Sequence, residues 1–102
     1  MKITLEKPFE YQGDIFYEID LDFDNASGKV LRQADLQMSK MKHFAPIKAD
    51  DTTYCLLVAS KLSKIPFETL DAMPLKVVNR LRLEVGSFLL NTASEDLESG
   101  LS

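Results

Sequence analysis

The chain has 102 residues, of which 45% are hydrophobic and 27% are charged. This length and balance are typical of one globular domain with its own core, and no apolar run approaches the ~20 residues of a membrane-spanning helix. The single cysteine excludes an internal disulfide, and residues 1–6 lack the apolar segment of a signal peptide, so we expect an intracellular protein.

The net charge of −4 is unevenly distributed along the chain. Residues 1–24 have a net charge of −5, residues 25–90 a net charge of +4, and the segment from 91 onward adds three acids. This asymmetry favours a charged partner or an internal charge match. It is too weak to indicate binding to nucleic acid.

Strict alternation of apolar and polar residues predicts a β-hairpin at the start of the chain, with strands over about 2–11 and 14–23. Gly13 supplies the positive φ of a tight turn. Pro8 lacks a backbone N–H, so the first strand is expected to lie at a sheet edge or to be bulged there. The odd-numbered face is expected to pack on the helices, with Ile3, Leu5, Phe9, Tyr11, Ile15, Tyr17, Ile19, Leu21 and Phe23.

The acidic series that begins at Asp20 invites comparison with a calcium-binding EF-hand loop. Such a loop needs glycine at its sixth position and glutamate at its twelfth. The chain has Asn25 and Leu31 at those positions. We therefore interpret the acids as the solvent face of the second strand, and we expect no metal site.

A first helix is predicted over about 27–41, capped by Ser27 or Asn25. Its apolar stripe contains Val30, Leu31, Ala34, Met38 and Met41. The connection over 42–49 contains Phe44 and Ile47. These two residues either anchor the connection on the core or form an exposed partner-binding patch.

The most apolar segment predicts a central helix over about 51–64, capped by Asp50 or Asp51 and covered on several sides. Cys55 lies within it, where a buried and inert thiol is expected. Pro66 favours the start of a short helix over 67–72.

A last helix is predicted over about 74–91, beginning at Pro74. Its inner face contains Leu75, Val78, Leu81, Val85, Phe88 and Leu89. Gly86 is unfavourable in a helix interior, which indicates that a neighbour approaches closely there. Residues 91–102 have the composition of an acidic, disordered tail. The expected fold class is α+β, a single domain over 1–90 in which an N-terminal hairpin packs on a bundle of three to four helices.

No pattern of catalytic residues is present. The chain has no glycine-rich phosphate loop, no paired Cys/His spacing for zinc and no nucleophile elbow. His43 and Cys55 are the only nucleophilic combination, and Cys55 is expected to be buried. We therefore expect no enzyme, no catalytic residue and no cofactor.

A helix–turn–helix reading of residues 59–83 gives an alternative, DNA-binding function. Its recognition helix would be the short helix over 67–72. That helix carries Glu68 and Asp71 but no base, whereas DNA phosphates require lysine or arginine. We therefore expect no nucleic acid partner.

Several segments together resemble a known family. They are the Asp-capped helix with a central Tyr54, the turn at Ile65-Pro66, the Leu-Asp-Ala-Met-Pro run at 70–74 and the Val-Gly-Ser-Phe-Leu-Leu run at 85–90. Upstream, residues 7–13 and 21–23 add to the match. This pattern resembles the tail assembly chaperones of tailed bacteriophages and prophages, the small proteins encoded just before the tape measure gene. The resemblance covers about residues 5–90 and leaves out the basic stretch 42–48 and the tail.

The resemblance implies a non-enzymatic protein in the cytoplasm of the bacterial host. Such a chaperone binds the long, hydrophobic tape measure protein, keeps it soluble, helps recruit tail tube subunits and is absent from the mature virion. Some members also have a longer, frameshifted form. The alternatives are a small phage or prophage DNA-binding or regulatory protein, and a homo-oligomeric adaptor whose apolar strips pair with each other.

A chaperone for an apolar helical client needs an exposed apolar strip with a charged rim. Two strips are candidates for partner binding. The first is at the end of the first helix and its loop, with Met38, Met41, Phe44 and Ile47. The second lies on the outer side of the last helix, with Val77, Leu83 and Leu90.

Overall fold

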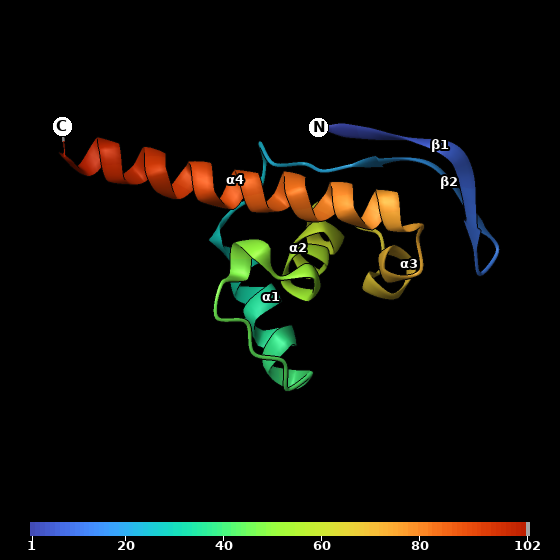
Figure 1. Cartoon of the computed structure of the whole chain (residues 1–102), viewed down its shortest axis with the longest axis horizontal. Coiled ribbons are helices and arrows are strands. Elements are labelled where there is room, and N and C mark those ends of the chain that lie inside the picture. The colour runs from blue at the N-terminus through green and yellow to red at the C-terminus, as the bar shows by residue number, and fades with distance from the viewer. Residues whose placement is uncertain (102) are drawn as a thin grey trace.

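The computed structural model describes the backbone of residues 1–101 and the side chains of residues 1–91. A two-stranded antiparallel hairpin precedes the helices, so the expected α+β class is confirmed (Figure 1). The elements in chain order are β1 (Lys2–Tyr11), β2 (Asp14–Asp20), α1 (Gly28–Lys40), the 3₁₀ helix η1 (Lys48–Asp50), α2 (Thr52–Ser63), α3 (Phe67–Asp71) and α4 (Leu75–Leu101). Within this described part of the chain, no helix is both long and apolar enough to span a membrane.

The hairpin turn forms where its glycine was expected. Gln12 and Gly13 have φ angles of 50° and 86°, the pair of positive values that a tight two-residue turn requires. The second strand ends at Asp20, earlier than the predicted residue 23. Leu21 is nevertheless fully buried, and its N–H donates to the carbonyl of Met1 at 2.7 Å.

A large bulge in β1 changes which face of β2 points inward. Thr4 pairs with Glu18 and Phe9 with Phe16, so residues 5–8 of β1 lie opposite Tyr17 alone. Side chains alternate between the two faces of a strand. A register shift by an odd number of residues therefore reverses which side chains of β2 point toward the core. Of the two alternatives expected at Pro8, a bulge is therefore present, and in this two-stranded sheet β1 is an edge strand as well.

The expected odd-numbered face of β2 is only partly correct for the same reason. Ile19 is fully buried, but Ile15 and Tyr17 are 52% and 63% exposed. Beyond the bulge, Phe16 takes the inner position and packs against the core.

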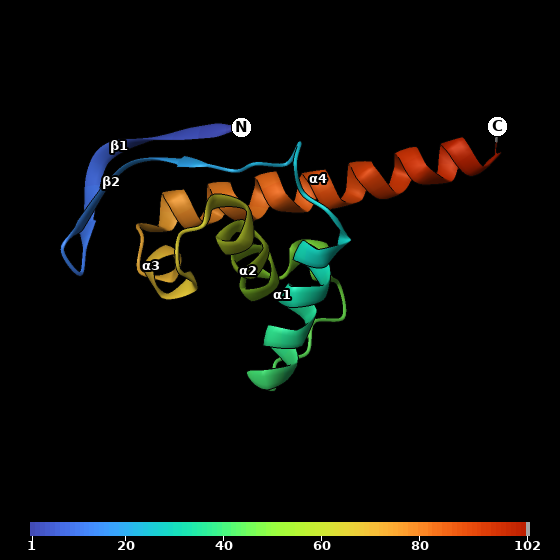
Figure 2. The same ribbon diagram turned by 180° about the vertical axis from the view of Figure 1, so that it is seen from behind.

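Helix α2 lies at the centre of the molecule, as its apolar composition predicted. Every residue from Tyr54 to Ala59 is buried. The helix contacts α1, α3, α4, η1 and β2, and Figures 1 and 2 show α1 and α3 on either side of it beneath α4. Asp51 is its cap, because its carboxylate accepts the N–H of Tyr54 at 2.8 Å. Lys64 ends it in the left-handed conformation, with φ 63°.

Helix α4 packs over α2 with Leu81 and Val85 fully buried. The Phe88 ring stacks on Phe23 at 4.3 Å between centroids. The expected close approach at Gly86 is confirmed, since a Cβ there would collide with the carbonyl oxygen of Ala49 in η1. Leu75 was wrongly placed on the inner face. It is 83% exposed, because it is the first residue of α4 and lies at the edge of the core.

The backbone of α4 continues to Leu101, whereas the sequence predicted an end near 91 and a disordered tail. Extending an existing helix adds a hydrogen bond for each residue that is ordered, without a new nucleation cost. The helix bounds therefore differ from the prediction. The side chains from 92 onward and all of Ser102 lie outside the described residues.

Candidate functional site

Three large apolar side chains are exposed on the connection between α1 and α2. Met41, Phe44 and Ile47 are 46%, 83% and 67% exposed. We call them the loop strip. Ala45, between them, is buried and anchors the connection on the core. Of the two readings that the sequence left open, the structure therefore supports an exposed patch.

Met38 does not belong to this strip, so its assignment to a partner surface is corrected. It is only 5% exposed and joins the core together with Ala34, one helical turn earlier. Met41 comes after the last residue of α1 and faces solvent. The apolar stripe of α1 thus divides into a core half and an exposed end.

Polar contacts on both sides hold the loop strip in place. At the α1 end, Lys42 takes a left-handed φ of 56°, and the His43 N–H donates to the Met38 carbonyl at 3.1 Å. At the α2 end, His43 Nε2 lies 2.9 Å from Asp51 Oδ1. Because Asp51 also caps α2, one carboxylate connects the loop to the central helix.

The surroundings of Asp51 lower the pKa of its carboxyl group. Partial burial alone would raise the pKa of this carboxyl group. The hydrogen bonds from His43 and from the Tyr54 N–H, together with attraction to the His43 ring, outweigh that effect and lower the pKa below its usual value. The contacts of the folded loop therefore favour the ionised form of Asp51.

Basic side chains border the loop strip. Lys40 and Lys42 are exposed. The Lys48 ammonium donates to Asp35 on α1 at 2.8 Å and lies 5.5 Å from the centre of the Tyr54 ring. The strip is therefore an apolar surface with a charged rim, supported by a loop that is fixed to both neighbouring helices.

The second predicted strip is only partly present on one face of α4. Leu83 and Leu90 are 53% and 60% exposed. They are seven residues apart, which places them on the same helical face. Val77 is half-buried and packs against the core under β1. It lies six residues before Leu83, a spacing that places the two side chains on different sides of the helix.

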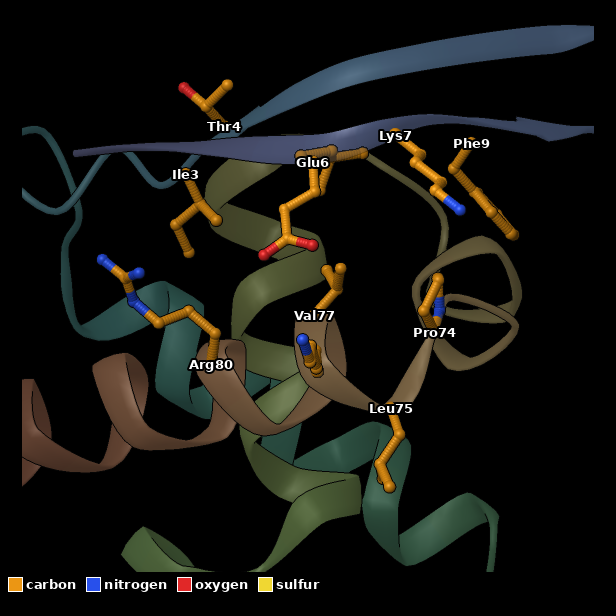
Figure 3. A pocket seen from close by; sticks show the side chains of 11 residues that line it. Ile3, Thr4, Glu6, Lys7, Phe9, Pro74, Leu75, Val77 and Arg80 are labelled. Carbon is orange, nitrogen blue, oxygen red and sulfur yellow. The ribbon is translucent and has the colours of Figure 1, made fainter.

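A third surface was not predicted from the sequence. It is a pocket of about 630 Å³ between the bulged part of β1 and the first turns of α4. Figure 3 shows Ile3 and Glu6 directed from β1 toward Val77 and Arg80 on α4, while Leu75 points away from the strand. The lining residues are Ile3, Thr4, Leu5, Glu6, Lys7, Phe9, Pro74, Leu75, Lys76, Val77 and Arg80. We call this surface the β1–α4 groove.

The Cys55 thiol is not activated as a nucleophile. Burial, together with the nearby carboxylates of Asp51 and Asp50, raises the pKa of the Cys55 thiol to about 11 despite the opposing charge of Arg82. The thiol lies 3.6 Å from the Ala49 carbonyl oxygen and is fully buried. Among the described side chains, no cluster of three or more His, Cys, Asp or Glu residues suited to a metal ion occurs.

The helix–turn–helix reading places its recognition helix at α3, which spans Phe67–Asp71 only. Its Thr69 and Leu70 are buried, and Glu68 and Asp71 are exposed. The side chains that this helix presents to solvent include two acids, which repel DNA phosphates.

Comparisons with protein-family models, with curated proteins and with solved structures returned no match to this chain.

Proposed function

We propose that this chain is a phage or prophage tail assembly chaperone that binds the tape measure protein, keeps it soluble and helps recruit tail tube subunits. In this role it is a non-enzymatic protein of the host cytoplasm and is absent from the finished virion. The support has two parts: the resemblance over about residues 5–90, and the loop strip.

The loop strip is the observation that carries the proposal. Phe44 is 83% exposed, and Met41 and Ile47, three residues before and after it in the chain, are 46% and 67% exposed. Fully burying a side chain of this size contributes about 1.5–3 kcal/mol. An aromatic and two aliphatic side chains on a fixed loop are well suited to cover the apolar face of a client helix. The charged rim, formed by Lys40, Lys42 and the Lys48–Asp35 ion pair, limits non-specific association of the free protein.

A co-expression experiment tests this role. The tape measure reading frame of the same phage is expressed with the wild-type chain or with a Met41→Glu/Phe44→Glu variant, and the soluble client is quantified. The variant should recover far less soluble client, because loss of about 3 kcal/mol of apolar contact weakens binding about hundredfold.

The hairpin provides a matched control. Ile15→Glu/Tyr17→Glu changes two side chains that are also exposed, at 52% and 63%, but lie on strand β2 of the hairpin and not on the connection between α1 and α2. This variant should retain client binding. Equal recovery of soluble client with the loop-strip variant and with wild type would show that the loop strip is not the binding surface. No soluble client with the wild-type chain would contradict the function itself.

A further inference from the structure

The two ends of α4 carry opposite and uncompensated charge. A helix has partial positive charge at its N-terminus and partial negative charge at its C-terminus. The first turn of α4 contains no acid and its last turn contains no base. Lys76 and Arg80 lie near the positive end, and the sequence near the negative end contains Glu95, Asp96 and Glu98. At each end, the side chains therefore carry charge of the sign that the helix dipole disfavours.

The positive end of α4 forms one wall of the β1–α4 groove. Lys7 on β1 and Lys76 on α4 line this groove, and neither makes an ion pair with another described side chain. Arg80 donates to Glu84 at 2.9 Å, and Glu6 is the acid among the lining residues. The net charge of the side chains that line the groove is therefore positive. The positive end of the α4 dipole adds to this charge.

The floor of the groove is apolar. Ile3 and Leu5 are buried, and Phe9 and Val77 are half-buried around them. The bulged residues 5–8 of β1 lie opposite Tyr17 alone, outside the regular pairing with β2. A volume of about 630 Å³ is within the roughly 300–1,000 Å³ of pockets that bury a ligand. A segment with acidic and leucine side chains would match both the floor and the rim.

We propose that the β1–α4 groove binds the acidic C-terminal segment of a second copy of this chain, residues 95–101. This segment contains three acids, no base and two leucines, Leu97 and Leu101. Docking the negative end of one α4 beside the positive end of another neutralises both. The inference is independent of the chaperone function, because it uses neither the loop strip nor a client.

The segment cannot reach the groove of its own chain. Helix α4 is continuous over 27 residues, which at about 1.5 Å per residue separates its ends by about 40 Å. Figures 1 and 2 show the C-terminus at the opposite end of the molecule from the bend of the hairpin. The contact therefore joins two copies, either reciprocally in an antiparallel two-fold dimer or head to tail in rings or open filaments.

Sedimentation velocity over a range of protein and salt concentrations tests the contact. The wild-type chain should self-associate at low salt and dissociate as the salt concentration rises, because the attraction is between exposed charges. Lys7→Glu/Lys76→Glu should weaken association about tenfold or more, because two attractions become repulsions. Lys29→Glu/Arg32→Glu makes the same change in net charge on α1 and should leave association unchanged.

A charge exchange identifies the partner segment. The variant Glu95→Lys/Asp96→Lys/Glu98→Lys should associate with itself much more weakly than the wild-type chain, as should the groove variant. A mixture of the two should associate, because each then offers the charge that the other lacks. A wild-type chain that stays monomeric at every concentration overturns the inference. So does a groove variant that associates like wild type, or a mixture that does not associate.

Discussion

Replacing Gly86 by alanine separates helix propensity from tertiary packing, because the two predict opposite signs. In an exposed helix interior, alanine is about 0.8–1 kcal/mol more favourable than glycine. In this protein a Cβ at position 86 would collide with the carbonyl oxygen of Ala49. The contacting atom belongs to the backbone, so a rotamer change cannot remove the collision.

The cost of this collision depends on how η1 is held. The Arg82 guanidinium donates to Asp50 at 2.8 Å, and the Cys55 thiol lies 3.6 Å from the same Ala49 oxygen. Moving Ala49 away from α4 disturbs both contacts. Overpacking of this kind costs about 1–3 kcal/mol. After the propensity gain is subtracted, Gly86→Ala should lower the free energy of unfolding by up to about 2 kcal/mol.

Urea unfolding followed by far-UV circular dichroism measures this difference, provided that the slope of the transition is unchanged. Gly28→Ala is the matched control, because a Cβ at position 28, in the first turn of α1, meets no atom within 4 Å. The control should be neutral or slightly stabilising. A Gly86→Ala protein that is more stable than wild type would refute the close packing of η1 on α4.

Two further predictions concern ionisable groups. The pKa of Asp51 is lower in the folded protein than in the unfolded chain, so its stabilising effect is present above about pH 4 and is lost as the pH falls through the folded pKa. Asp51→Asn should therefore show a weaker loss of stability on acidification in denaturation series at neutral and acidic pH, and an unchanged acid dependence would contradict the role of this carboxylate. The Cys55 thiol, with a pKa of about 11, should stay protonated and inaccessible near neutral pH. A thiol-reactive chromophore should label it only after denaturation, and rapid labelling of the native protein would show that α2 is not the closed core described above.

Much of the fold was predictable because its signals are local. The turn at Gly13 follows from the need for positive φ, and a cap at Asp50 or Asp51, of which the structure uses Asp51, follows from the free N–H groups at a helix start. The central position of α2 follows from the lack of a polar face between Tyr54 and Ala59. Even the close approach at Gly86 was indicated, because a glycine inside a helix needs a reason.

The candidate surfaces were predicted less well, because exposure depends on which element covers each residue. Met38 and Met41 belong to the same predicted stripe, yet α1 ends between them and only Met38 reaches the core. Leu75 has the spacing of the inner face but lies at the first residue of α4, beyond the packed elements. Periodicity identifies a face, and it does not show how far the neighbouring element extends.

Local sequence thus determined the hairpin, the helix starts and the central helix, since turn geometry, capping and periodicity act within a few residues. Register and coverage are properties of distant segments, and only the tertiary structure decided them. The bulge over residues 5–8 turned Ile15 and Tyr17 outward and opened the groove beside α4. The packing of α1 and α2 left Phe44 in solvent and buried Ala45 next to it. These long-range contacts set the surfaces on which both proposed interactions rest.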